Sequence, residues 1–163
     1  MNKIQLALLD QINDTVQNIK KHNVGEILNW ILRNQIAKYS LANDYYFSTQ
    51  STLDHVKNLG LDISNRNNKS KKNKITFEHP VPCKIIALEL LKNPEKKSIQ
   101  NILNITDNVV ILTHEENELF RKFKLNSKMP KDLKFGDDVF ARYKIVGIKV
   151  LMKKIKMYGA LKR

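Results

Sequence analysis

Cysteine and long apolar runs are nearly absent from this 163-residue sequence. Its single cysteine, Cys83, excludes a disulfide within the chain and a four-cysteine zinc site. No apolar run approaches the ~20 residues needed to span a bilayer, and the N-terminus lacks the charged, apolar and small-residue layout of a signal peptide. These absences predict a cytoplasmic protein that does not enter a membrane.

Acidic residues are also scarce. The chain has 16 Asp and Glu against 29 Lys and Arg, which gives a formal net charge of +13. A surplus of this size favours polyanionic partners, and nucleic acid is the most common of these. The length allows one domain with its own core, or one core with an appendage.

Two stretches of the chain carry basic residues without acids. Residues 64–74 contain no acid and no apolar residue, and they predict either a solvated linker or a loop laid along phosphates. After Asp138 there is again no acid, and aromatic residues alternate with cations, which suits backbone contact or base stacking; apolar residues there also predict packing on the core. The expected phosphate contacts are Arg66, Lys69, Lys71, Lys72, Lys74, Arg142, Lys144, Lys153 and Lys154.

The first sixty residues predict helices. Apolar residues recur at helical spacing over roughly residues 3–21 and again over 27–36. A short third helix precedes Gly60, which is expected to end it because glycine accepts the left-handed conformation. Residues 1–60 are therefore expected to form a helical support, with a homodimer surface as a further expectation. His22 and His55 are expected in ordinary surface or packing roles.

In the segment "ITFEHPVPCKII", residues 75–86, a β-branched and aromatic run ends with Glu78 and His79. Pro80 and Pro82 follow before the next expected helix. Neighbouring residues of a regular strand point to opposite faces. Glu78 and His79 can therefore serve one site only if the backbone bends after them, and proline favours such a bend by restricting φ.

A second strand and a capped helix follow in "TDNVVILTHEENELFRKF", residues 106–123. Residues 109–112 predict a strand by composition and length. Thr113 and Glu116 have capping-box spacing and predict a helix that begins there. The order is strand, helical insertion, strand and capped helix.

Together these residues resemble the HNH nucleases, the ββα-metal endonucleases. Glu78-His79-x-x-Pro82 resembles their first motif, Asn108 their central asparagine, and Asn117, nine positions later, their helix residue. The resemblance covers roughly residues 75–123. It implies that His79 is the general base and that Glu78 and Asn117 hold a divalent cation, most simply Mg²⁺. His114 and Glu118 remain alternative helix ligands. Asn108 would tie the loop after the first strand through hydrogen bonds to the backbone.

The sequence as a whole predicts an α+β protein. Its expected parts are a helical support (1–60), a basic linker (61–74) and a ββα-metal nuclease core with a helical insertion and a basic C-terminal extension (75–163). The expected function is metal-dependent cleavage of double-stranded DNA by a small restriction or defence endonuclease. The alternatives are a non-catalytic DNA- or RNA-binding regulator on the same fold and a helical protein-interaction module.

Overall fold

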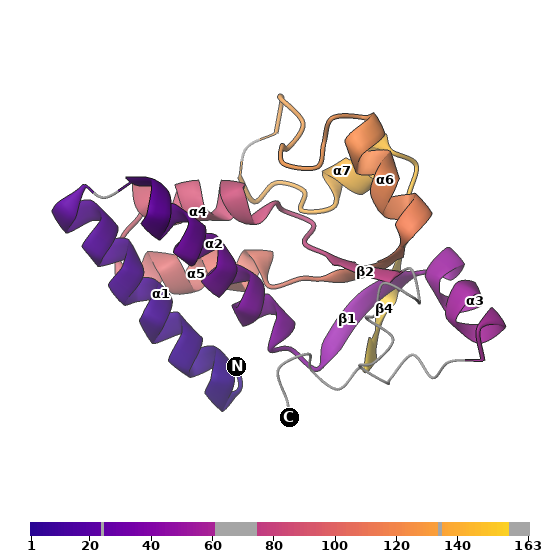
Figure 1. The fold of residues 1–163 in the computed structure, drawn as a ribbon, viewed down its shortest axis with the longest axis horizontal. Coiled ribbons are helices and arrows are strands. Elements are labelled where there is room, and N and C mark those ends of the chain that lie inside the picture. The colour runs from indigo at the N-terminus through magenta and orange to yellow at the C-terminus, as the bar shows by residue number, and fades with distance from the viewer. Residues whose placement is uncertain (24, 61–74, 134, 157–163) are drawn as a thin grey trace.

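The computed structural model spans the whole chain and describes all residues except 24, 61–74, 134 and 157–163. It contains helices and a small sheet, which confirms the α+β prediction (Figure 1). The elements in chain order are α1 (Lys3–His22), α2 (Gly25–Leu41), β1 (Tyr45–Thr49), α3 (Gln50–Asn58), β2 (Ile75–Glu78), α4 (Cys83–Lys92), α5 (Lys96–Thr106), β3 (Val110–Thr113), α6 (His114–Lys122), α7 (Ala141–Ile145) and β4 (Val150–Lys156).

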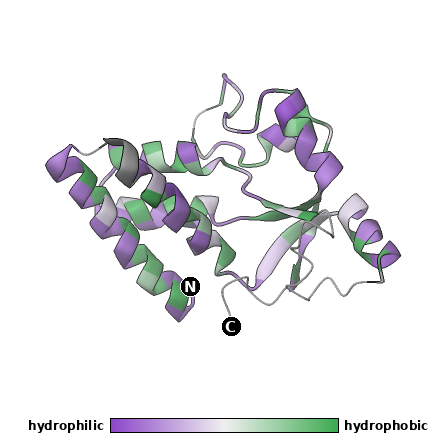
Figure 2. Ribbon diagram, viewed as in Figure 1, coloured by the Kyte–Doolittle hydropathy of each residue, from purple (hydrophilic) through white to green (hydrophobic). Residues whose placement is uncertain are grey.

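Four helices, α1, α2, α4 and α5, pack together on one side of the molecule (Figure 1). Hydrophilic and hydrophobic residues alternate along them, as expected for helices with one buried side (Figure 2). Helix α1 begins with a capping box between Asn2 and Gln5 and ends at Asn23, which has a φ of 50°. The core shared by the four helices includes Ile12, Leu32 and Leu90. Residues from before and after the expected linker therefore form one helical layer.

The sheet has the strand order β2-β3-β1-β4. Strand β1 runs parallel to β3 and antiparallel to β4, and β2 runs antiparallel to β3. The core on one face includes Val110 and Leu112 with residues of α6 and α7, and the core on the other face includes Val109 and Ile111 with Val56 of α3. This alternation along residues 109–112 follows the two-residue period of a strand, and it buries both sides of β3.

The boundary expected at residue 60 is corrected by this arrangement. Strand β1 lies inside the segment expected to be a mostly helical support, and it pairs with two strands from the second half of the chain. Helices α4 and α5, expected as an insertion in the second unit, pack on α1 and α2 instead. Gly60, however, has a φ of +62° two residues after the last residue of α3, in the left-handed conformation that was predicted.

No helix among the described residues is both long and apolar enough to cross a membrane.

Candidate active site

The predicted strand–strand–helix unit is present as β2, β3 and α6. In the antiparallel β2–β3 pair, Ile75 lies opposite Thr113 and Glu78 lies opposite Val110. Helix α6 begins directly after β3 and contacts both strands. Its start is fixed by the predicted capping box, in which the Thr113 side chain accepts from the Glu116 N–H and the Glu116 carboxylate accepts from the Thr113 N–H. Glu78 therefore lies at the end of this antiparallel pair away from the start of α6.

Arg142 holds the turn that follows β2. It is fully buried and lies on α7. Its Nε donates to the Pro80 carbonyl oxygen at 2.9 Å, and its Nη2 donates to Glu78 Oε1 at 2.7 Å and to the His79 carbonyl oxygen. Its Nη1 donates to the carbonyl oxygen of Leu125, after α6, at 2.6 Å. One guanidinium on α7 thus binds β2, the turn that follows it and the loop after α6.

These contacts correct the expectation that Arg142 binds phosphate. A side chain with no exposed surface, whose donors are used by four oxygen atoms of the protein, cannot lie on a nucleic-acid backbone in this fold. The guanidinium also lies over the ring of Phe120 on α6, with 4.7 Å between its carbon and the ring centre. Arg142 positions the Glu78-His79 segment instead.

The Glu78 carboxyl group is partly buried and forms an ion pair. Its side chain is 22% exposed, and its ion pair with Arg142 lies at 2.7 Å. Burial raises the pKa of Glu78 above its usual value of 4.5, and the charge and hydrogen bond of Arg142 lower it by a smaller amount. The ion pair therefore only partly offsets the cost of removing this carboxylate from water.

The raised pKa of Glu78 predicts how Glu78→Gln changes the pH dependence of stability. The folded protein holds this proton at a higher pH than the unfolded chain does. The stability contributed by protonated Glu78 is therefore fully present below pH 4.5 and is lost as the pH rises through the folded pKa. Urea unfolding from pH 4 to pH 7 should show wild type losing stability relative to Glu78→Gln, which cannot titrate. A difference that stays constant or changes in the opposite direction contradicts this assignment.

A polar network lies beside the site, and the sequence predicted only its helix cap. Glu116 Oε2 accepts from Thr49 Oγ1 at 3.0 Å and lies 3.3 Å from Thr52 Oγ1. Tyr143 is almost fully buried next to Arg142, and burial, Glu78 and Glu116 all raise its pKa. Only the Thr113–Glu116 spacing could be identified in the sequence, because Thr49 and Tyr143 come from distant segments.

Asn108 does not make its expected contact. Its side-chain Nδ2 donates to the carbonyl oxygen of Ile105 at 3.4 Å, and its backbone N–H donates to that of Thr106 at 2.7 Å. Both acceptors belong to the end of α5. Asn108 therefore closes the helix before β3, and the turn after β2 is held by Arg142 instead.

The three candidate helix ligands lie on α6. Glu118 Oε1 pairs with Arg121 at 3.2 Å and lies 3.9 Å from His114 Nε2, so these two alternatives contact each other on the exposed side of the helix. Asn117 is half-buried and makes no hydrogen bond to another described residue. Glu78 Oε2 likewise makes none within the described ranges. One carboxylate oxygen and one amide oxygen are the donor types that Mg²⁺ prefers, so these two residues fit a magnesium ion chemically.

The described residues contain no group of three or more His, Cys, Asp and Glu side chains placed to hold a metal. A cation at Glu78 would therefore depend on water and phosphate oxygens for most of its ligands. The Arg142 guanidinium, bonded to the same carboxylate, would repel the cation and weaken its binding.

The other expected phosphate contacts fall in three groups. Arg66, Lys69, Lys71, Lys72 and Lys74 lie outside the described residues. Lys144 is exposed and binds Asp138 at 2.7 Å. Lys153 and Lys154 are exposed on β4, an edge strand, and the Lys154 ammonium lies 4.7 Å from the centre of the Phe47 ring.

Comparisons with protein-family models, with curated proteins and with solved structures each find no match.

Proposed function

We propose that this protein is a metal-dependent endonuclease of the HNH type that cleaves DNA, in the manner of a small restriction or defence nuclease. The observation that supports this most is the placement of Glu78 and His79. Glu78 is the last residue of β2 in a strand–strand–helix unit, and His79 follows it directly. Buried Arg142 donates to the Glu78 carboxylate and to the His79 backbone carbonyl.

His79 would act as the general base. A neutral imidazole accepts a proton near neutral pH and can take it from the water that attacks the phosphorus atom. The His79 and Pro80 carbonyl groups both accept from Arg142, so the backbone that carries the imidazole is held in one position. A base fixed in this way needs little reorganisation when the reaction begins.

Glu78 and Asn117 would hold the divalent cation through the Oε2 carboxylate oxygen and the amide oxygen. When bound, the cation would stabilise the negative charge that develops on the scissile phosphate. Glu78 would bind the cation through one carboxylate oxygen and Arg142 through the other, Oε1. The same ion pair would fix the orientation of the carboxylate plane.

Supercoiled plasmid tests this proposal directly. Purified protein should convert the plasmid to relaxed or linear DNA in the presence of Mg²⁺ and should lose this activity in EDTA. Gel electrophoresis of a time course separates the three forms, and Ca²⁺ as a replacement ion tests whether the activity depends on the type of cation. Equal conversion with and without EDTA, or no cleavage of either the plasmid or single-stranded DNA under any divalent ion, contradicts a metal-dependent nuclease.

A non-catalytic nucleic-acid-binding regulator is the second candidate. It is favoured by the same Arg142 ion pair, since a carboxylate used to hold the fold needs no metal to account for it. The net charge of +13 serves either function. Salt-dependent binding of DNA or RNA without cleavage in Mg²⁺ would favour the regulator.

A further inference from the structure

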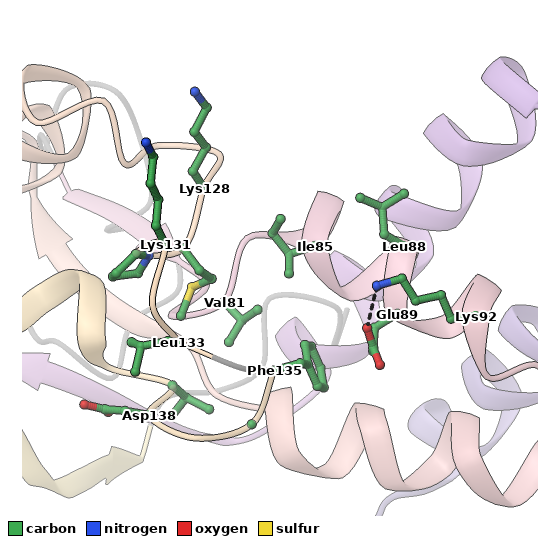
Figure 3. Close-up of a pocket in the computed structure, with 14 residues that line it drawn as sticks. Val81, Ile85, Leu88, Glu89, Lys92, Lys128, Lys131, Leu133, Phe135 and Asp138 are labelled. Atoms are coloured by element: carbon green, nitrogen blue, oxygen red, sulfur yellow. Dashed lines mark hydrogen bonds and ion pairs between the residues drawn. The ribbon is translucent and has the colours of Figure 1, made fainter.

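A cavity of about 720 Å³ lies between α4 and the loop after α6 (Figure 3). Its volume falls within the roughly 300–1,000 Å³ that small-molecule sites occupy. Its walls are mainly apolar and come from both sides. Ile85 and Leu88 lie on α4, Val81 lies in the turn before it, and Met129, Leu133 and Phe135 lie in the loop. The cavity is therefore large enough for a nucleobase, and its apolar walls suit the faces of one.

A second hollow of about 380 Å³ lies on the other side of α4, against α2. Leu88 borders both hollows and is 46% exposed. Lys84 and Lys92 lie one helical turn before and after Leu88, on the same side of α4. The two hollows and this ridge form one continuous surface, which we call the α4 face.

Cations without acidic partners surround the α4 face. The two acids that border the larger cavity are already bonded: Glu89 pairs with Lys92 at 3.4 Å, and Asp138 pairs with Lys144 at 2.7 Å. Four further cations form no ion pair with a carboxylate of the described residues, and these are Arg33, Lys84, Lys128 and Lys131. The surface thus combines an apolar cavity with positive charge available to an anionic ligand.

We propose that the α4 face binds a DNA strand that presents an unpaired base. The base would enter the cavity against Phe135, and the phosphates on either side of it would lie on the four unpaired cations. Stacking on an aromatic side chain together with cations along the backbone is the general mode of single-strand binding. The inference rests on the proposed function in one respect, namely that the bound strand is the substrate of the Glu78-His79 site.

The position of the cavity supports this connection. Val81 lines it and lies two residues after His79, so one short segment carries the proposed base and borders the cavity. Asp138 lines it too and accepts from the N–H of Phe140, two residues before Arg142. A base in the cavity would therefore place the adjoining backbone near both segments of the candidate active site.

An unpaired strand suits the α4 face better than the other polyanions do. Intact duplex DNA offers phosphates, but its bases are stacked and paired and cannot fill an apolar cavity. An acidic amphipathic helix needs one groove that accepts a row of side chains. Here two compact hollows are separated by the exposed ridge of α4.

Fluorescence anisotropy in EDTA tests the proposal without any contribution from cleavage. The probes are labelled oligothymidine of about 20 nucleotides, an abasic strand with the same number of phosphates, and a duplex of the same length. We expect the wild type to bind oligothymidine about tenfold more tightly than the abasic strand, because only oligothymidine can stack. Phe135→Ala should remove most of this difference and leave the affinity for the abasic strand nearly unchanged.

The double variant Lys128→Glu/Lys131→Glu tests the binding of phosphates. It should weaken binding of both single strands and reduce the slope of log affinity against log salt by about 0.7 for each phosphate that the protein no longer neutralises. The matched control is Lys3→Glu/Lys20→Glu, which changes the net charge equally on the exposed side of α1. The control should leave the salt slope unchanged.

Leu88→Glu is a second test, at a half-exposed position outside the buried core. It should weaken oligothymidine binding with an unchanged thermal unfolding midpoint. Equal wild-type affinity for oligothymidine and the abasic strand, or equal slopes for the two charge variants, overturns the proposal. If polyglutamate displaces the DNA, and Leu88→Glu and Phe135→Ala weaken this displacement, the surface binds an acidic protein instead. If the strand binds with the expected preferences but is not cleaved in Mg²⁺, the proposed nuclease function is contradicted and the proposed binding surface is not.

Discussion

Replacing Arg142 with Ala is expected to lower the free energy of unfolding by about 3–5 kcal/mol, the usual cost of removing one partner from a buried ion pair. The substitution would leave the Glu78 carboxylate and three backbone carbonyl groups without their donor. It would also remove the guanidinium from the Phe120 ring. Urea denaturation followed by circular dichroism measures the change.

Lys144→Ala is the matched control for this prediction. Lys144 lies two residues after Arg142 and also makes an ion pair at 2.7 Å, but its side chain is 74% exposed. Exposed pairs contribute roughly 0–1 kcal/mol, so this variant should unfold close to wild type. If Arg142→Ala does not fold, Arg142→Lys provides the measurement, because lysine keeps the charge and cannot reach all four acceptors. A decrease of under about 1 kcal/mol in both Arg142 variants would show that these hydrogen bonds contribute little.

His79→Ala is expected to reduce DNA cleavage by roughly 10²–10⁴-fold, the usual contribution of a general base. Binding of DNA in EDTA should remain close to wild type, because a base acts on the transition state more than on the ground state. The Arg142 hydrogen bonds should survive, since Arg142 binds the backbone carbonyl of residue 79 and not its imidazole. Plasmid relaxation in Mg²⁺ gives the rate, and anisotropy gives the affinity.

The control for His79→Ala is His22→Ala, which removes an exposed histidine at the end of α1. Its rate should equal that of the wild type. Cleavage by His79→Ala within a few-fold of wild type would show that another group takes the proton. A parallel loss of DNA affinity would instead place His79 in substrate binding.

The features that depend on neighbouring residues could be predicted from the sequence alone. The helical spacing of Leu8, Ile12 and Val16 placed α1, and the Thr113–Glu116 spacing placed the start of α6. These elements form because local periodicity and capping act within a few residues. The two strands of the proposed ββα unit were found for the same reason, and the left-handed conformation of Gly60 follows from the absence of a side chain.

Pairing between distant segments was decided only by the tertiary structure. Strand β1 is five residues long and lies between two helices, and its hydrogen-bonding partners β3 and β4 come about sixty and a hundred residues later. No local pattern states which strand pairs with which. Helices α4 and α5 join α1 and α2 because their apolar sides complete one core, and this too depends on all four helices being present.

Arg142 shows the same division within the candidate site. In the sequence it is one cation among many in an acid-free stretch, and charge alone predicted an exposed phosphate contact. In the fold it is the most enclosed large side chain near Glu78, because α7 places it against the turn after β2. The sequence by itself determined that Glu78 and His79 stand together at the end of a strand. Only the tertiary structure decided which residue holds them, because the four acceptors of one guanidinium come from two segments, 78–80 and 125, that are distant in the chain and converge only on folding.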